Sequence, residues 1–161
     1  MQGIRMENKK TIYLKWINQG LESIKAFQDL RRGSKTYGCF FYPCFRNSLD
    51  YANARWQEAV LSLAYEYKYH PAKNNIGRIA AGIDYWCKIQ HKNGSFEENL
   101  KGENSFAATA FSLYAVAEAA RIAGVKKRWG PCFKKAAEWL LKNDEVILIN
   151  QEAAAALALM E

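Results

Sequence analysis

Three side chains with the chemistry of proton abstraction lie close together in the sequence, at Tyr42, Arg46 and Arg55. A guanidinium binds a carboxylate through paired hydrogen bonds, and a neighbouring cation lowers the pKa of a tyrosine from its usual value of about 10. Such a tyrosine can act as a general base. We therefore take these as the candidate catalytic residues, with Tyr42 as the base and the arginines as partners of an acidic group. Arg55 has a second interpretation, an ion pair with Glu58 one helical turn further on.

A second group of residues combines flat rings with planar polar groups, which suit the faces and the hydroxyls of a sugar. The candidate substrate-binding residues are Trp56, Gln57, Glu58, Glu103, Asn104, Asn150 and Gln151. Trp56 also fits an apolar helix face and is then a core residue. Asn104 and Asn150 have an alternative role as helix caps, in which the side-chain oxygen accepts from the free N–H groups of a first turn.

Adjacent carboxyl groups occur at Glu97 and Glu98, just after the turn at Gly94. Paired with Glu58 or Glu103, these acids have the chemistry for acid–base hydrolysis of a glycosidic bond. The alternative is that adjacent acids in a polar loop are simply solvated.

These residues must be positioned by helices, because apolar residues recur at spacings of three and four along most of the chain. The middle of the chain predicts a helix over 79–90, a loop over 91–103 and a second helix over 104–123. The same plan recurs on both sides: Gln28 aligns with Gln90, 55–63 with 105–113, 137–140 with 83–86, and 150–154 with 104–108. An internal repeat of this kind predicts an all-α protein made of tandem helical hairpins.

The two helices of each predicted pair differ in side-chain size. First helices carry Trp16, Trp86 and Trp139, whereas second helices are rich in alanine over 107–120 and 153–156. Small side chains let helix axes approach closely, which predicts an inner layer of second helices wrapped by an outer layer of first helices. The amino-terminal ends of the inner helices then meet at one mouth, where their free N–H groups favour anions.

Composition indicates one domain over the 161 residues, half of which are apolar or aromatic. The formal charge of +7 is dispersed and no nucleic-acid-binding module is present, so we expect no nucleic-acid partner. The four cysteines form no CxxC pair, and we expect no metal and no cofactor. Reduced thiols, a polar amino terminus and the lack of an apolar run of about 20 residues predict a cytoplasmic protein without a membrane span.

The printed sequence ends inside an apolar helix, over 157–160, without a stop signal. Such an end exposes apolar surface. We expect that 1–161 is the N-terminal part of a longer protein, or that self-association buries this apolar C-terminal edge.

The successive hairpins, the alanine-rich second helices and the loop Gln90-His91-Lys92-Asn93-Gly94-Ser95-Phe96 resemble the α/α-toroid superfamily. This superfamily includes the heparinase-type polysaccharide lyases and the squalene-cyclase and prenyltransferase group. The segments 53–59 and 86–117 are similar to uncharacterised toroid proteins of surface-polysaccharide gene clusters. The resemblance covers about 20–160, and it implies that this chain forms about half of a toroid.

The resemblance implies a carbohydrate-associated domain, either polysaccharide lyase-like or glycan-binding, with a cleft at the inner-helix N-termini and an acidic oligosaccharide as partner. In a lyase, an arginine neutralises the carboxylate of a uronic acid while a tyrosine abstracts the proton. Two alternatives stay open: a non-catalytic helical-repeat scaffold for protein interaction, and a relative of the terpenoid cyclases or prenyltransferases. The acid-rich motif and the zinc ligands of those enzymes have no counterpart here, and whether the protein is an enzyme is left open.

Overall fold

A computed structural model describes residues 9–41, 53–124 and 126–160. Within these residues the chain forms six α-helices and three short 3-10 helices, and its β-pairing is limited to two isolated bridges. The elements are α1 (Lys9–Ala26), η1 (Ala54–Glu58), α2 (Ala59–Tyr69), η2 (Pro71–Lys73), α3 (Ile76–Ile89), α4 (Phe106–Ala123), η3 (Lys127–Trp129), α5 (Gly130–Leu140) and α6 (Ile149–Met160). The prediction of an all-α protein is confirmed.

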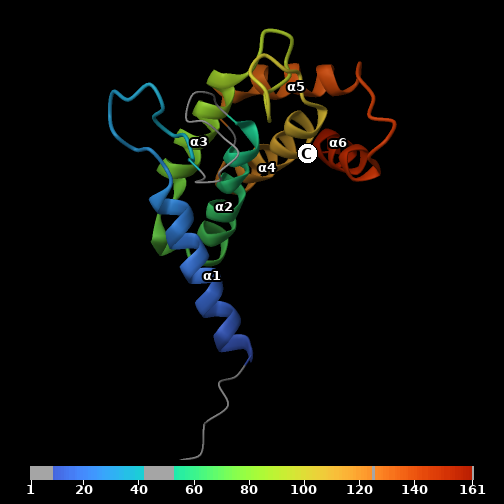
Figure 1. The fold of residues 1–161 in the computed structure, drawn as a ribbon. Helices are drawn as coiled ribbons and strands as arrows, with labels where there is room; N and C mark the ends of the chain where they lie inside the picture. The colour runs from blue at the N-terminus through green and yellow to red at the C-terminus, as the bar shows by residue number, and fades with distance from the viewer. Residues whose placement is uncertain (1–8, 42–52, 125, 161) are drawn as a thin grey trace, which may run out of the picture.

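Helix α4 lies at the centre of the molecule, with α2 on one side and α6 on the other (Figure 1). Its alanines pack in the core; Ala108, Ala110 and Ala119 are fully buried. Helices α3 and α5 also pack against α4. The alanine-rich helix of the middle pair is therefore internal, as predicted. Closure of the hairpins into part of a toroid stays a prediction.

By length and composition alone, α4 could cross a membrane, since it has 18 residues of high mean hydropathy. However, 61% of this segment is buried inside the protein. Burial of this extent is typical of a core helix, so one such segment is a weak indication of a membrane span. From the sequence, no apolar run long enough to span a membrane is expected, and α4 corrects that expectation. The cytoplasmic location stays a prediction.

Gln90 connects the loop after α3 to helix α5. Its Nε2 donates hydrogen bonds to the carbonyl oxygens of Gly94, at 3.1 Å, and of Cys132, at 2.9 Å. Gly94 has a φ of +104°, and a Cβ at this position would overlap the carbonyl oxygen of Lys135. Both the backbone conformation and the close approach of α5 therefore require glycine.

Gln28 makes the equivalent connection one hairpin earlier. Its Nε2 donates to the carbonyl oxygens of Gly38, at 3.3 Å, and of Arg78 on α3, at 2.8 Å. Gly38 has a φ of +93°, and a Cβ there would overlap the carbonyl oxygen of Ala81. The predicted alignment of Gln28 with Gln90 is confirmed by these matching contacts.

The inner helices repeat in a different register from the one expected. Asn53 caps η1 by accepting from the backbone N–H of Arg55 at 2.8 Å, and Ser105 caps α4 by accepting from that of Ala108 at 3.0 Å. Asn53 therefore corresponds to Ser105, and the alignment of 55–63 with 105–113 is wrong by two residues. The capping role considered for Asn104 is wrong as well, because the adjacent hydroxyl takes it.

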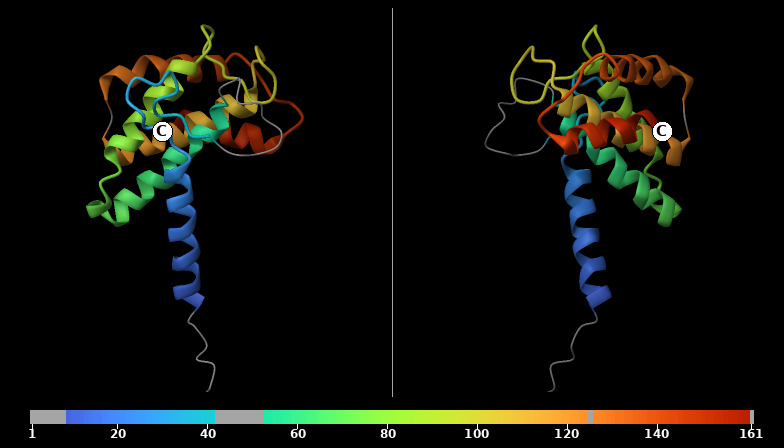
Figure 2. Two further views of the ribbon diagram at one scale, coloured as in Figure 1. Left: turned by 60° about the vertical axis from the view of Figure 1, so that its left-hand side comes forward. Right: turned by 90° about the vertical axis from the view of Figure 1, so that its right-hand side faces the viewer.

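Helix α1 is joined to the body of the protein near its C-terminal end. Lys25 Nζ lies 2.8 Å from Glu66 Oε1 on α2, and Arg78 Nη1 on α3 donates to the carbonyl oxygen of Lys25 at 3.2 Å. The rest of α1 projects from the body like an arm in all the views (Figure 2). Trp16 on this arm is 60% exposed, whereas Trp86 on α3 is fully buried.

Candidate functional site

A groove of about 490 Å³ runs between α2 and α4. Its lining combines aromatic, small and polar side chains: Glu58, Ala59, Leu61, Ser62, Tyr65, Phe111, Tyr114 and Ala115. Glu58, at the end of η1, and Ser62 and Tyr65, on α2, follow helical spacing, and Phe111 and Tyr114 do so on α4. We call this the α2–α4 groove.

Glu58 stands at one end of the α2–α4 groove, at the junction of η1 and α2. Burial raises the pKa of its carboxyl group to about 7; the charge of Arg55 opposes this shift and that of Glu98 adds to it. Glu58 Oε1 is buried, and among the described residues no group donates a hydrogen bond of good geometry to it. An acid of this kind can hold or release a proton at neutral pH.

Arg55 lies between the groove acid and an aromatic ring. Its Nε is 2.6 Å from Glu58 Oε1, and its guanidinium carbon lies 4.2 Å from the centre of the Phe111 ring. The ion pair with Glu58, one of two interpretations of Arg55, is therefore present, as a charge contact without the alignment of a hydrogen bond. This arrangement holds Phe111 and Glu58 in fixed positions relative to each other.

Further along α2, Tyr65 belongs to a hydrogen-bonded set of side chains. The Tyr65 hydroxyl donates to Glu118 Oε1 at 3.2 Å, and this hydrogen bond raises the pKa of Tyr65. Arg121 Nε and Nη2 donate to the same carboxylate at 2.6 and 2.7 Å. The Tyr65 ring is thereby held against α4.

Glu98 joins the starts of the first two inner helices. Its backbone carbonyl accepts from Asn53 Nδ2 at 2.7 Å, and its Oε2 accepts from Ser105 Oγ at 2.8 Å. Glu98 thus connects the N-terminal ends of these two helices, and a shared mouth for all the inner helices stays a prediction. The charge of Glu98 also acts on Glu58, so the two acids belong to one electrostatic cluster.

Glu103 organises the loop that precedes α4. Its Oε1 accepts from the backbone N–H groups of Glu98, at 2.6 Å, Leu100, at 3.1 Å, and Asn99. Burial by itself acts to raise the pKa of Glu103, but these hydrogen bonds hold it below its usual value. The structure thus gives this predicted ligand a role in the shape of the loop.

Asn104 belongs to a similar loop network. Its Oδ1 accepts from Asn93 Nδ2 at 2.9 Å and from the Ser95 hydroxyl. The ring nitrogen Nδ1 of His91 lies 3.3 Å from the same oxygen. These contacts tie together the two ends of the loop between α3 and α4.

Gln57 and Trp56 lie away from the groove lining. Gln57 is fully buried; its Oε1 accepts from the backbone N–H of Phe40 at 3.2 Å, and its Nε2 donates to the carbonyl oxygen of Asn53 at 3.4 Å. Trp56 is half-buried and lines a separate hollow with Phe27 and other apolar residues. Both therefore support the η1 turn that presents Arg55 and Glu58.

Asn150 and Gln151 lie in the first turn of α6, which begins at Ile149. Asn150 is therefore inside the helix, so the capping role considered for it is wrong. The next residue, Glu152, accepts from the backbone N–H of Glu145 at 2.8 Å, which ties this end of α6 to the loop before it. The backbone N–H of Gln151 donates to the carbonyl oxygen of Leu148 at 2.9 Å, as part of the first turn of the helix.

Tyr42 and Arg46 lie outside the described residues. In the part of the chain that the structure describes, no group of three or more histidine, cysteine, aspartate or glutamate side chains is placed to hold a metal ion. Three groove residues, Tyr65, Phe111 and Tyr114, were not predicted. Their spacing of three and four on amphipathic helices was a usable signal, but the pairing of α2 with α4 was needed to bring them together.

The fold and the groove define an all-α protein of tandem helical hairpins with an aromatic groove between two inner helices. No protein-family model, curated protein or solved structure matches the chain. The α/α-toroid relationship therefore stays a prediction.

Proposed function

We propose that this protein is a carbohydrate-associated helical-hairpin domain that binds an oligosaccharide in the α2–α4 groove. The observation that carries the proposal is the position of Glu58, a partly exposed carboxyl group whose pKa is raised to about 7, at the end of a groove lined by aromatic rings. Because the Glu58 side chain is 30% exposed, a hydroxyl of a bound sugar can reach this carboxyl group and form a hydrogen bond with it.

The groove lining suits a sugar ring. Tyr65, Phe111 and Tyr114 offer apolar faces for stacking, and two of these rings are held in place, Tyr65 by Glu118 and Phe111 by Arg55. Ser62 adds an exposed hydroxyl. Rings that are held before binding lose less conformational entropy when a ligand arrives.

The charges favour a neutral oligosaccharide over the acidic one expected from the sequence. Among the described residues that line the groove there is no lysine or arginine, and Glu58 is its one carboxyl group. Arg55 lies nearby but is engaged with Glu58 and Phe111. An anionic sugar would therefore lack a free cation among the described groove residues.

If the domain is catalytic, the described groups suit hydrolysis better than elimination. Glu58, with a pKa of about 7, is available as a proton donor, and Glu98 contributes a second carboxyl group to the same cluster. The lyase scheme instead requires Tyr42 and Arg46, about which the described residues say nothing, and Arg55, which is engaged with Glu58. We therefore propose Glu58 as the acid of any glycosidic cleavage.

Two other functions compete with this proposal. A terpenoid-cyclase relative would use the same acid and aromatic rings to protonate an isoprenoid chain, so an isoprenoid is a necessary comparison ligand. A protein-interaction scaffold is favoured by a separate apolar groove between α1 and α2.

Titration calorimetry with neutral hexasaccharides, uronic-acid oligosaccharides and a soluble isoprenoid diphosphate tests the proposal. We expect a neutral hexasaccharide to bind, and Phe111→Ala to weaken binding roughly tenfold through lost stacking. Tyr37→Ala is the matched control, since Tyr37 is an aromatic residue that is 43% exposed on a loop outside the groove lining. Release of reducing ends that disappears in Glu58→Gln would establish hydrolysis.

Circular dichroism should show that Phe111→Ala is folded, and Glu58→Gln provides a second, isosteric test of binding. If no neutral sugar binds, or if binding is equal in Phe111→Ala, Glu58→Gln and Tyr37→Ala, the proposed function is wrong. Binding of the isoprenoid alone would instead favour the cyclase-like alternative.

A further inference from the structure

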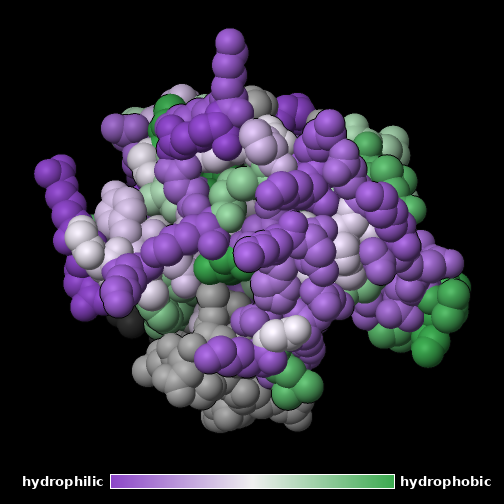
Figure 3. Space-filling view, turned by 90° about the horizontal axis from the view of Figure 1, so that it is seen from above, coloured by the Kyte–Doolittle hydropathy of each residue, from purple (hydrophilic) through white to green (hydrophobic). Residues whose placement is uncertain are grey.

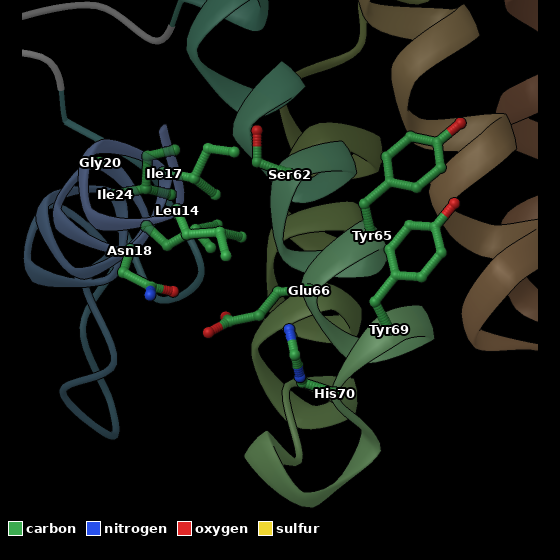
Figure 4. Close-up of a pocket in the computed structure, with 11 residues that line it drawn as sticks. Leu14, Ile17, Asn18, Gly20, Ile24, Ser62, Tyr65, Glu66, Tyr69 and His70 are labelled. Carbon is green, nitrogen blue, oxygen red and sulfur yellow. The ribbon is translucent and has the colours of Figure 1, made fainter. Parts of the chain in front are cut away.

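An open apolar groove of about 660 Å³ separates α1 from α2. Figure 4 shows Leu14, Ile17 and Ile24 on the α1 side of this groove, opposite the α2 residues that line its other wall. Leu14 is 47% exposed and Ile17 is 56% exposed, although both are large apolar residues. We call this the α1–α2 groove.

The opposite end of the inner layer is also uncovered. Helix α6 buries Ala154, Ala155 and Ala158, while its other side exposes Ile149, Leu157 and Met160. Ala153 and Ala156 are exposed between them, which completes an apolar stripe at helical spacing.

The segment before α6 extends this apolar surface. Val146, Ile147 and Leu148 are exposed, and Figure 3 shows apolar side chains gathered at this edge of the molecule. A patch of this extent marks an interaction surface.

The segments that carry the two uncovered surfaces differ in charge. The described segment 9–41 exposes one acid, Glu22, and several bases, among them Lys9, Lys15, Arg32 and Lys35. The segment 144–160 contains Asp144, Glu145 and Glu152 and no lysine or arginine. Opposite charges at the two ends of one chain favour contact between the N-terminal end of one copy and the C-terminal end of another.

The internal packing shows what such a groove accepts. Helix α4, rich in small residues, packs closely beside α2, and α6 packs beside α4. An alanine-rich helix is therefore the kind of element that lies against α2 in this fold. The free α6 of another copy has this character and supplies the larger Ile149, Leu157 and Met160 to fill the space.

We propose that helix α6 of one copy docks in the α1–α2 groove of a second copy. The contact joins two different surfaces, so each copy offers one groove and one helix, and association either closes into a ring or extends as a chain. The α1–α2 groove shares Ser62 and Tyr65 with the proposed sugar site, but the substitutions that test the docking, on α1 and α6, lie outside that site.

Size-exclusion chromatography with light scattering of the 161-residue chain tests this docking. We expect wild type to exceed the monomer mass increasingly with concentration. Ile17→Asp in the groove and Leu157→Asp on α6 should each be monomeric. An equimolar mixture of the two variants should form a 1:1 complex, because one variant keeps an intact helix and the other keeps an intact groove.

Leu100→Asp is the matched control. Leu100 is 69% exposed on a loop outside both surfaces, so this substitution should leave association unchanged. Leu14→Asp and Met160→Asp provide a second pair in case one variant of the first pair does not fold, as judged by circular dichroism. A monomeric wild type at millimolar concentration overturns the proposal. So does an Ile17→Asp variant that still self-associates, because that result indicates an α6–α6 contact between copies.

Discussion

Gln28 and Gln90 make the same two hydrogen bonds in consecutive hairpins. Each side-chain amide donates to the carbonyl oxygen of a following glycine and to a carbonyl oxygen of the next outer helix. One glutamine thus closes its own loop and also positions the neighbouring hairpin. The repeat is held together at these points by polar contacts as well as by apolar packing.

Replacing Gln90 with glutamate tests this connection. The substituted side chain would place a carboxylate against the carbonyl oxygens of Gly94 and Cys132 and would remove both donated hydrogen bonds. We expect Gln90→Glu to lower the free energy of unfolding by about 2 kcal/mol, measured by urea denaturation at pH 7. Gln19→Glu, on the exposed part of α1, is the control and should change stability little. Equal effects of the two substitutions would contradict a structural role for Gln90.

The loop glycines allow a comparison between backbone strain and steric overlap. Gly33 and Gly38 both have positive φ, but a Cβ at Gly33 meets no atom within 4 Å, whereas one at Gly38 overlaps the carbonyl oxygen of Ala81. We expect Gly33→Ala to cost about 1 kcal/mol, and Gly38→Ala roughly 3 kcal/mol or more. Gly94→Ala should behave like Gly38→Ala. Thermal or urea unfolding measures the difference, and three similar losses would show that backbone strain alone decides.

Glu58 should make stability depend on pH in a specific direction. Its pKa is raised to about 7 in the folded protein from 4.5, so the folded state disfavours ionisation. The resulting loss of stability is absent below pH 4.5, grows as the pH rises and is complete above about pH 7.

We therefore expect Glu58→Gln to match wild type near pH 4 and to be more stable above pH 7 by roughly 1–2 kcal/mol, allowing for solvent screening of this partly exposed side chain. Urea denaturation at both pH values is the measurement. A difference between the two proteins that is the same at both pH values would show that Glu58 titrates normally.

Lys25 and Glu66 should be energetically coupled, because Glu66 is buried and its side chain is only 3% exposed. Burial acts to raise the pKa of Glu66, but hydrogen bonds from Lys25 and Asn75 hold it below its usual value. The pair therefore stabilises the fold above the unfolded pKa of 4.5, and this contribution is lost as the pH falls further.

We expect Lys25→Met to lower the free energy of unfolding by about 3 kcal/mol at pH 7, because it leaves a buried carboxylate without its cation. The double variant Lys25→Met with Glu66→Gln should recover much of this loss. Hydrogen exchange should show faster opening of α1 in the single variant. Strictly additive effects of the two substitutions would contradict coupling.

Single residues show how far the sequence could predict the site. Asn53 caps η1, a role that asparagine commonly takes just before a helical pattern. Asn104 was misassigned because Ser105, equally suitable, stands next to it, and the choice depends on where the loop lets the helix begin. Gln57 looked like a ligand, but the loop at Phe40 folds over it and uses its amide.

The sequence by itself determined the helical hairpins, because helical spacing, capping residues and the repeated glutamine act over short distances along the chain. Tertiary structure decided the α2–α4 groove, the raised pKa of Glu58 and the uncovered sides of α1 and α6. Burial, electric field and exposure depend on which helix faces which. Those pairings arise from packing between residues far apart in the sequence, where no local pattern specifies the partner.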